Sequence, residues 1–270
     1  MFADKNNKTV TIKGFTFGDG TPRICVPIVG HTTEEILKHA DVVRAELDRL
    51  DEKYADKPEL KVAVIEWRSD FFIEVGDEEK VTNILHELNK RFEDRILLFT
   101  FRSEEQGGEL RHDRVGMHLE NVYKNVIKNH LVDMVDVEAA AGNYNIARAT
   151  TKAHEGGIAV LMSYHDFYKT PHDLDIAEKL RQMEILGGDI LKMAFMPKNE
   201  FDSRRMMELN QRMVIERYRP VVLISMGSTG VMTRVKGKET GACLTFASIG
   251  TESAPGQMEA DDLMALLANQ

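Results

Sequence analysis

The chain has 270 residues, of which 43% are hydrophobic and 29% are charged, as is ordinary for a soluble globular protein. Its formal net charge of −9 at pH 7 disfavours a nucleic acid or an anionic membrane surface as partner, because both attract basic faces. No window approaches the roughly 20 consecutive apolar residues of a membrane span. Residues 1–10 lack the apolar stretch of a signal peptide, so we expect a cytoplasmic protein.

The first predicted element is a β-hairpin over residues 9–18 (TVTIKGFTFG), whose hydrophobicity alternates on both sides of Gly14. Eight short apolar runs follow, each rich in β-branched or aromatic residues and short enough for a strand that is buried on both faces. They cover residues 23–28, 62–67, 96–101, 131–137, 157–163, 189–195, 220–226 and 242–247. Cys25 and Cys243 lie in the first and the last run, which favours buried free thiols over a disulfide framework.

Amphipathic, charged stretches with helical spacing separate these runs. In residues 33–50, one helical face carries Ile36, Leu37, Ala40, Val43 and Leu47. Thr32 or Thr33 is the expected N-cap. Eight alternating strands and helices predict an α/β fold, a single (β/α)8 TIM barrel over residues 1–270, with the hairpin closing its bottom. A doubly wound open sheet is the main competitor, but residues 29–35 (VGHTTEE) lack its glycine-rich phosphate loop.

Polar side chains stand at or near the carboxyl ends of the predicted strands, where barrels carry their catalytic residues. They are Glu66 and Arg68, Thr100 and Arg102, Asp136 and Glu138, His165, Lys192, Ser225, and, in the later loops, Arg234, Ser253 and Gln257. Alternation along a strand places Glu66 and Arg68 on one side of their strand, and likewise Asp136 and Glu138. Each residue alone has an ordinary structural explanation, such as a lysine that reaches water or a structural ion pair. Their convergence at one rim predicts a functional site.

Lys192 carries most of the predicted chemistry. It lies within the apolar run of residues 190–195 (ILKMAF), and burial disfavours an ammonium group, so we expect its pKa to fall below about 10.4. A neutral amine attacks a ketone to form a Schiff base, which then accepts electrons when a neighbouring C–H proton is removed. His165 is the candidate base near neutrality, and an arginine suits a substrate carboxylate.

These residues predict a lyase or aldolase that needs no cofactor and acts on a small anionic carbonyl compound. A metal site formed by Asp136, Glu138 and His165 is a weaker alternative, because their spacing is not that of metal ligands.

Several short motifs together resemble those of one family. They are EWRSD (66–70), FTFRSEEQGGE (99–109), VDVE (135–138), SYHDFYKTP (163–171), ILKMAFMP (190–197), ISMGSTGVMTR (224–234) and SAPGQ (253–257). With these motifs in order over roughly residues 20 to 265, the chain resembles the type I 3-dehydroquinate dehydratases. The resemblance implies a barrel enzyme of the shikimate pathway, expected to be a homodimer. Such an enzyme dehydrates 3-dehydroquinate to 3-dehydroshikimate without a metal or an organic cofactor.

The resemblance also implies a role for each matched residue. Lys192 would form the imine with the substrate ketone, and His165 would remove the C2 proton and help the C1 hydroxyl leave as water. Arg234 would anchor the carboxylate. The other matches are Glu66, Arg68 and Arg102 on the hydroxyl side, Met226 and Phe246 on the apolar wall, Asp136 and Glu138 in a buried polar network, and Ser253 and Gln257 in a lid over residues 248–257.

One position departs from the family pattern. The family's loop reads Arg-Ser-x-x-Glu-Gly-Gly, whereas residues 102–108 read RSEEQGG, with Gln106 in place of a glutamate thought to orient the histidine. Glu105 is adjacent, but an offset of one residue points it elsewhere. Either His165 works as a less basic catalyst, or the chain is an impaired relative that binds the metabolite. A class I aldolase for a sugar phosphate is a further alternative, because residues 226–230 (MGSTG) suit a phosphate-binding helix start.

Overall fold

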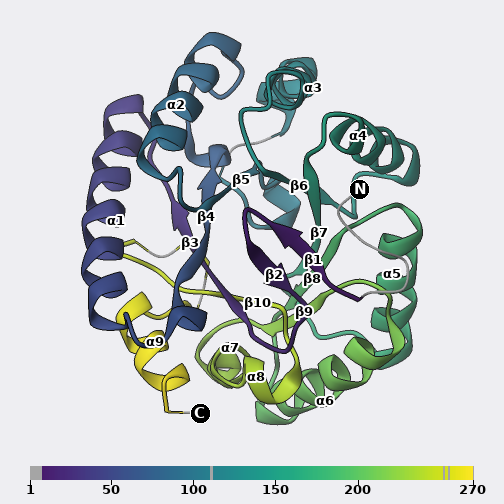
Figure 1. Ribbon diagram of the computed structural model, residues 1–270. Coiled ribbons are helices and arrows are strands. Elements are labelled where there is room, and N and C mark those ends of the chain that lie inside the picture. Colours follow the sequence, from purple (N-terminus) through teal and green to yellow (C-terminus); the bar gives the residue numbers. More distant parts are fainter. Residues whose placement is uncertain (1–7, 110–111, 252, 255, 270) are drawn as a thin grey trace.

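The eight predicted strands form one parallel sheet that curls into a barrel (Figure 1). A computed structural model describes residues 8–109, 112–251, 253–254 and 256–269. Its main sheet contains β3 (Arg23–Ile28), β4 (Val62–Arg68), β5 (Ile96–Thr100), β6 (Met134–Glu138), β7 (Ala159–Asp166), β8 (Ile190–Phe195), β9 (Val221–Ser225) and β10 (Leu244–Phe246). The strand order is β10-β3-β4-β5-β6-β7-β8-β9. A backbone hydrogen bond of 3.1 Å from Cys243 N to Val221 O joins the outer strands, so the barrel is nearly closed and the predicted fold is confirmed.

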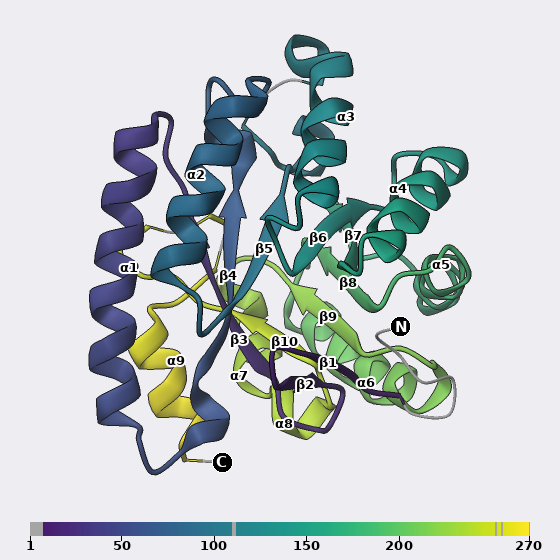
Figure 2. The same ribbon diagram turned by 45° about the horizontal axis from the view of Figure 1, so that its top comes forward.

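Helices surround the barrel on the outside (Figures 1 and 2). They are α1 (Thr33–Lys53), α2 (Glu78–Arg91), α3 (His112–Lys128), α4 (Asn143–Glu155), α5 (Asp173–Ile185), α6 (Glu200–Glu216), α7 (Val231–Val235), α8 (Gly237–Thr240) and α9 (Ala260–Leu267), with 3-10 turns η1 (Pro58–Leu60), η2 (Ser69–Phe71), η3 (Glu104–Gln106) and η4 (Ser228–Gly230). Thr32 caps α1 as predicted, because its hydroxyl oxygen accepts a hydrogen bond of 3.2 Å from Glu35 N. The buried face of α1 comprises Ile36, Ala40, Val43, Leu47 and Leu50, whereas Leu37 is only half-buried.

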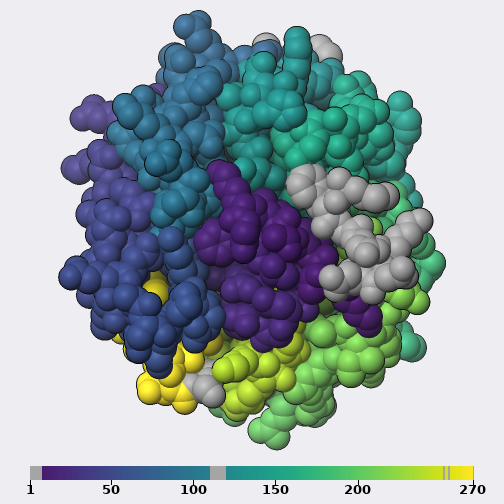
Figure 3. All heavy atoms as spheres, viewed as in Figure 1, coloured from purple at the N-terminus to yellow at the C-terminus, as the bar shows by residue number. Residues whose placement is uncertain are grey.

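The predicted hairpin, β1 (Val10–Ile12) and β2 (Phe15–Phe17), closes the amino end of the barrel. Its turn places Lys13 and Gly14 at positive φ, 45° and 81°, which glycine adopts without strain. Lys13 Nζ donates to Arg95 O just before β5, and Arg23 Nε at the start of β3 donates to Thr16 O. The apolar side chains Val10, Ile12 and Phe17 are buried against the barrel interior. The hairpin therefore lies across the centre of this face (Figures 1 and 3).

Three strands begin two or three residues later than predicted, namely β6, β7 and β10. The apolar residues before each of them complete the final turn of the preceding helix instead. The hydrogen bonds that do so run from Leu131 N to Val126 O, from Ile158 N to Ala153 O and from Ala242 N to Gly237 O, at 2.8–3.1 Å. Such six-residue closures are typical of helix C-termini, and the apolar residue that follows packs against the helix.

Apolar side chains fill the barrel between the hairpin and the opposite end. Cys25, Val64, Leu98 and Leu161 belong to this inner cluster, whereas a second cluster packs the outer faces of the strands against the helices. Both cysteines are buried and unpaired, as predicted. Among the described helices, none is both long and apolar enough to cross a membrane. Because the amino end is sealed, the carboxyl ends of the strands remain for a polar site.

Candidate active site

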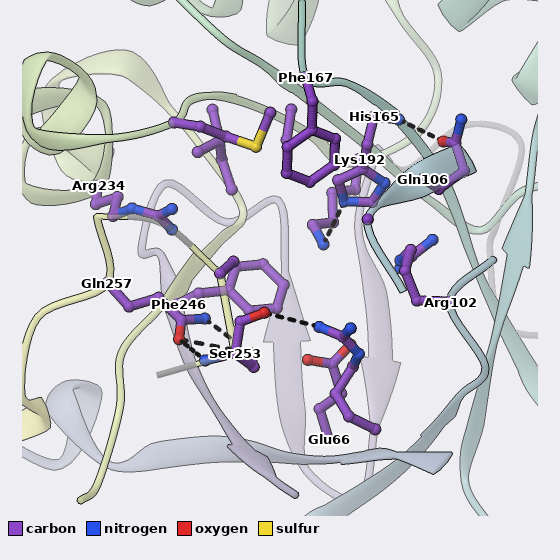
Figure 4. Close-up of a pocket in the computed structure, with 16 residues that line it drawn as sticks. Glu66, Arg102, Gln106, His165, Phe167, Lys192, Arg234, Phe246, Ser253 and Gln257 are labelled. Atoms are coloured by element: carbon purple, nitrogen blue, oxygen red, sulfur yellow. Dashed lines mark hydrogen bonds between the residues drawn. The ribbon is translucent and has the colours of Figure 1, made fainter. Parts of the chain in front are cut away.

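A pocket lies at the carboxyl end of the barrel (Figure 4). It brings together all the residues that the sequence assigns to catalysis and substrate binding, Glu66, Arg68, Arg102, Gln106, His165, Lys192, Met226, Arg234, Phe246, Ser253 and Gln257. Phe167, Ala194, Ile224 and Ala254 also line it and were not predicted. Phe167 and Ala194 follow His165 and Lys192 by two positions, so extending the strand alternation would have found them.

Lys192 projects from β8 into the pocket, where its side chain is almost completely buried. Its Nζ lies 3.2 Å from His165 Nε2 and 4.3 Å from the centre of the Phe246 ring. Burial, followed by the nearby positive charge of Arg102, lowers the pKa of Lys192 to about 8. The expected fall in this pKa is confirmed.

His165, near the end of β7, is buried next to this amine. Burial lowers its pKa well below the usual value, and the cations Arg102, Lys192 and Arg68 lower it further. The sequence predicted a base that titrates near neutrality; the structure differs because burial and three nearby cations favour the neutral imidazole. Among the described residues, His165 Nδ1 has no hydrogen-bond partner. The Phe167 ring stacks nearby, with the ring centres 6.4 Å apart.

Gln106 contacts the backbone of His165 rather than its ring. Its Oε1 accepts a hydrogen bond of 2.6 Å from His165 N, so η3 is fastened to β7 (Figure 4). Gly107 ends this turn at a φ of 85°, and a Cβ there would lie 2.3 Å from the Phe167 ring. The neighbouring Glu105 is exposed, so its carboxylate does not replace the missing family glutamate, as the sequence predicted.

Arg102 is held by the polar network predicted for β6. Its Nη2 pairs with Asp136 Oδ2 and its Nη1 with Glu138 Oε1, both at 2.9 Å. Ser163 Oγ also links Arg102 to Asp136, because it accepts a hydrogen bond from Arg102 Nη1 and donates one to Asp136 Oδ1, each at 2.8 Å. Asp136 and Glu138 do not line the catalytic pocket themselves. They orient a guanidinium that does.

The prediction missed Asp70, which fixes the second pocket arginine. Arg68 Nε and Nη2 donate to the two oxygens of Asp70 at 2.8 Å, a bidentate pair, and this carboxylate is fully buried. Asp70 also accepts hydrogen bonds from Arg102 N and Glu109 N. It lies within the quoted EWRSD motif, but in η2, where strand alternation no longer indicates direction.

From the loop of residues 248–257, Ser253, Ala254 and Gln257 line the pocket, whereas Glu252 and Pro255 lie outside the described residues. Arg68 Nη1 donates to Ser253 O at 3.0 Å, and Ser253 N donates to Gln257 Oε1 at 2.8 Å. The remaining free volume is about 40 Å³, room for roughly two or three water molecules.

Two other predicted features receive no support from the geometry. Of residues 226–230, the suggested phosphate-binding turn, only Met226 lines the pocket, and α7 behind them is only five residues long. Across the described part of the chain, no group of three or more His, Cys, Asp or Glu side chains is arranged to hold a metal ion. Asp136 and Glu138 instead serve Arg102, whereas His165 lies beside Lys192.

Comparison with known proteins shows which family the chain resembles. The sequence model of the family described as type I 3-dehydroquinase matches residues 24–270. The 3-dehydroquinate dehydratase of Clostridioides difficile (strain 630) is 37% identical over 262 residues, which are 96% of either protein. That of Bacillus subtilis (strain 168) is 34% identical over 259 residues, 96% of this chain and 95% of the relative.

A solved structure agrees with these sequence relatives. The crystal structure of the type I 3-dehydroquinate dehydratase from Clostridium difficile with covalently modified comenic acid matches with a TM-score of 0.86 at 35% sequence identity. The match covers 97% of each chain. By both sequence and structure, the chain belongs to the type I 3-dehydroquinase family.

Proposed function

We propose that this chain dehydrates 3-dehydroquinate to 3-dehydroshikimate through a Schiff base on Lys192. The observation that carries the proposal is a buried amine of lowered pKa whose nitrogen lies 3.2 Å from a neutral imidazole. Membership in a family whose relatives are 3-dehydroquinate dehydratases supplies the substrate. No cofactor enters the proposed reaction, because the imine itself accepts the electrons.

The reaction begins with attack of the neutral Lys192 amine on the substrate ketone, and loss of water gives a protonated imine. His165 Nε2 then takes the adjacent C2 proton, while the electron pair moves toward the iminium nitrogen. The resulting enamine expels the C1 hydroxyl, which takes the proton from the imidazolium and leaves as water. Addition of water to the imine then releases the ketone product and restores the amine.

The remaining pocket residues position the substrate in this proposal. Arg234 binds the carboxylate, and Met226 and Phe246 form the apolar wall. Glu66, Arg68 and Arg102 face the ring hydroxyls. Ser253 and Gln257 belong to a lid that opens for entry, since the covered pocket holds only about 40 Å³. Among relatives, the Clostridium difficile structure with covalently modified comenic acid is consistent with covalent chemistry at such a pocket.

The decisive experiment mixes the protein with 3-dehydroquinate and follows the ultraviolet absorbance of the conjugated enoate product. Absorbance should rise with the wild type and stay flat with Lys192→Ala. Borohydride should add the mass of the reduced adduct at Lys192 with 3-dehydroquinate, and not with a sugar phosphate. Binding without any absorbance change would instead favour the alternative that Gln106 marks an impaired, metabolite-binding relative.

The same proposal extends to the state in which the enzyme works. Residues 1–270 act as a single barrel domain, in a cytoplasmic homodimer. Light scattering at working concentration measures the assembly, and a monomer of 30.6 kDa would contradict it. Activity that persists after dialysis against a chelator would agree with a reaction that needs no metal.

A further inference from the structure

A second cavity opens on the outside of the barrel, where α3 and α4 stand apart beside β6 (Figure 2). We call it the α3–α4 groove; it is bounded by residues 120–127 of α3, 135–138 of β6 and 141–152 in and before α4. Its free volume is about 400 Å³, against about 40 Å³ in the covered catalytic pocket. That volume lies within the range of about 300–1,000 Å³ typical of small-molecule sites.

The walls of the groove are apolar and already formed. Ile127, Val137 and Ile146 are buried side chains that line it, together with Phe101. The Tyr123 ring adds an aromatic surface, and its hydroxyl is satisfied, because it accepts from Phe101 N at 3.3 Å and donates to Asp136 O at 3.2 Å. An apolar ligand of aromatic size would therefore meet apolar surface without displacing a hydrogen bond.

The charges in the groove are separated by depth. At the mouth, Glu120 pairs with both Lys124 at 3.0 Å and Arg148 at 2.9 Å, and all three side chains are 39–49% exposed. Lys152 lines the groove as well and has no ion pair with a described residue, so the described lining residues at the mouth comprise three cations and one carboxylate. This basic rim stands out in a chain whose net charge is −9, and it attracts an anion.

The inner end is acidic and touches the catalytic network. Glu138 lines the groove with its side chain 13% exposed, and both Arg102 Nη1 and Ser103 N donate to its Oε1. Among the described residues, the hydrogen bonds to the Glu138 side chain all use Oε1, so Oε2 can accept a further one. The other side of this carboxylate holds Arg102, a residue of the catalytic pocket.

We propose that the α3–α4 groove binds a small organic anion with an apolar, aromatic-sized body, its acid group at the Lys124–Arg148–Lys152 rim and a hydrogen-bond donor toward Glu138. Occupancy is then coupled to catalysis, because the ligand's donor and Arg102 share the Glu138 carboxylate, which helps to orient Arg102. Binding itself does not depend on the proposed reaction. The coupling rests on the proposed function and is measured separately.

The test uses the fluorescent probe 8-anilinonaphthalene-1-sulfonate, which combines a sulfonate, an aromatic body and an N–H donor. We expect one site per chain that 3-dehydroquinate does not displace. Ala149→Trp should fill the groove and abolish binding, and Arg148→Gln with Lys152→Gln should weaken it about tenfold. The uncharged N-phenyl-1-naphthylamine should bind at least tenfold more weakly than the sulfonate. Bound probe should also change the KM for 3-dehydroquinate at least twofold in the wild type and not in Ala149→Trp.

Matched controls keep the outcome interpretable. Lys128→Gln with Arg181→Gln removes the same charge outside the groove lining and should leave probe binding unchanged. Thermal melts establish that each variant is folded, and the charge variants still test the rim should Ala149→Trp unfold. The proposal is overturned if the probe is displaced by 3-dehydroquinate, if groove variants bind like the wild type, or if Ala149→Trp acts only by changing self-association. An unchanged KM with bound probe would overturn the coupling alone.

Discussion

Each end of the barrel contains a buried cation, but the two cations differ in whether carboxylates neutralise them. At the amino end, Arg95 is fully buried and pairs with both Asp51 and Asp94. At the carboxyl end, Lys192 is 7% exposed and makes no ion pair with a described residue; it lies beside His165, and burial and the charge of Arg102 lower its pKa despite Glu66 nearby. The first arrangement keeps a charge stable, and the second makes an amine easy to deprotonate. One barrel therefore carries a structural cation before β5 at its amino end and a reactive cation in β8 that faces its carboxyl end.

The largest expected effect comes from removing the unpaired cation. Lys192→Met keeps the length of the side chain but abolishes the amine, so turnover of 3-dehydroquinate should fall at least about 10⁴-fold, because the covalent route is lost. The absorbance assay measures this loss. Lys198→Met, an exposed lysine beyond the same strand, is the matched control and should keep wild-type turnover. Residual activity within a factor of ten of the wild type would contradict an imine at Lys192.

The same substitution should stabilise the fold. The unfolded chain keeps this lysine near its usual pKa of 10.5, whereas the folded pKa is about 8. Below pH 8 the folded state therefore holds a disfavoured ammonium, which costs about 3 kcal/mol, and the cost shrinks as the pH rises from 8 toward 10.5. We expect Lys192→Met to raise the free energy of unfolding at pH 7 by up to this amount, with a smaller gain at pH 9.5.

Arg95→Met is the counterpart at the amino end and should change stability in the opposite direction. It removes a cation that forms ion pairs with two partly exposed carboxylates, and it should lower the free energy of unfolding by about 1–2 kcal/mol. Denaturant titration measures both variants. If both substitutions changed the free energy of unfolding in the same direction, the proposed contrast between the two ends of the barrel would be wrong.

The pH dependence of catalysis tests the reactive cation without any mutation. The free enzyme must hold Lys192 neutral, and with a pKa of about 8 only about a tenth is neutral at pH 7 and a hundredth at pH 6. The lowered pKa of His165 favours its neutral form, so the amine is the group expected to limit the rate on the acidic side. We expect kcat/KM to rise about tenfold per pH unit up to pH 8 and to level off above it. A profile that is flat between pH 6 and 8 would exclude the amine as the titrating group.

A smaller effect should follow from loosening Arg68. Asp70→Asn leaves one acceptor where Arg68 now has two, and Arg68 also holds Ser253 of the covering loop. We expect KM to rise roughly tenfold with a smaller change in kcat, and residues 248–257 to exchange amide hydrogens faster. Asp56→Asn, an exposed aspartate in a distant loop, is the charge-matched control. If amide hydrogens exchanged faster over the whole chain, the substitution would have lowered global stability and not only loosened residues 248–257.

The sequence predicts the position of a residue only where that residue follows a regular pattern, such as the alternation of side chains along a strand. Glu66, Arg68 and Lys192 stand in strands, so alternation and the barrel rule place them in one pocket. The same rules do not predict Asp70, because it is the second residue of a 3-10 turn and not part of a strand. Helix-capping residues such as Leu131 are apolar like strand residues, and this shifts the predicted strand starts.

Some features have no local pattern at all. The low pKa of His165 results from burial first and then from Arg102, Lys192 and Arg68, which come from three different parts of the chain and meet only in the folded barrel. The α3–α4 groove is a space between helices, and no motif marks it. The orientation of Gln106 toward a backbone amide is likewise set by how η3 docks on β7.

Gln106→Glu should give the smallest and most specific effect. Glutamate keeps an acceptor for His165 N and adds a negative charge that Arg102, Arg68 and Lys192 stabilise. That charge favours the imidazolium and raises the pKa of His165. In the imine state Lys192 no longer titrates, so the acidic limb of kcat reports the histidine and should move to higher pH.

Above that limb, a more basic His165 should raise kcat by a few-fold. Glu105→Gln, at the exposed neighbouring position, should leave the limb where it is. Profiles of kcat against pH for the wild type and both variants make the comparison. If Gln106→Glu folds normally and its limb does not move, then position 106 acts only through the backbone of β7. The carboxyl end of the barrel would then set the basicity of its histidine by burial and surrounding cations alone.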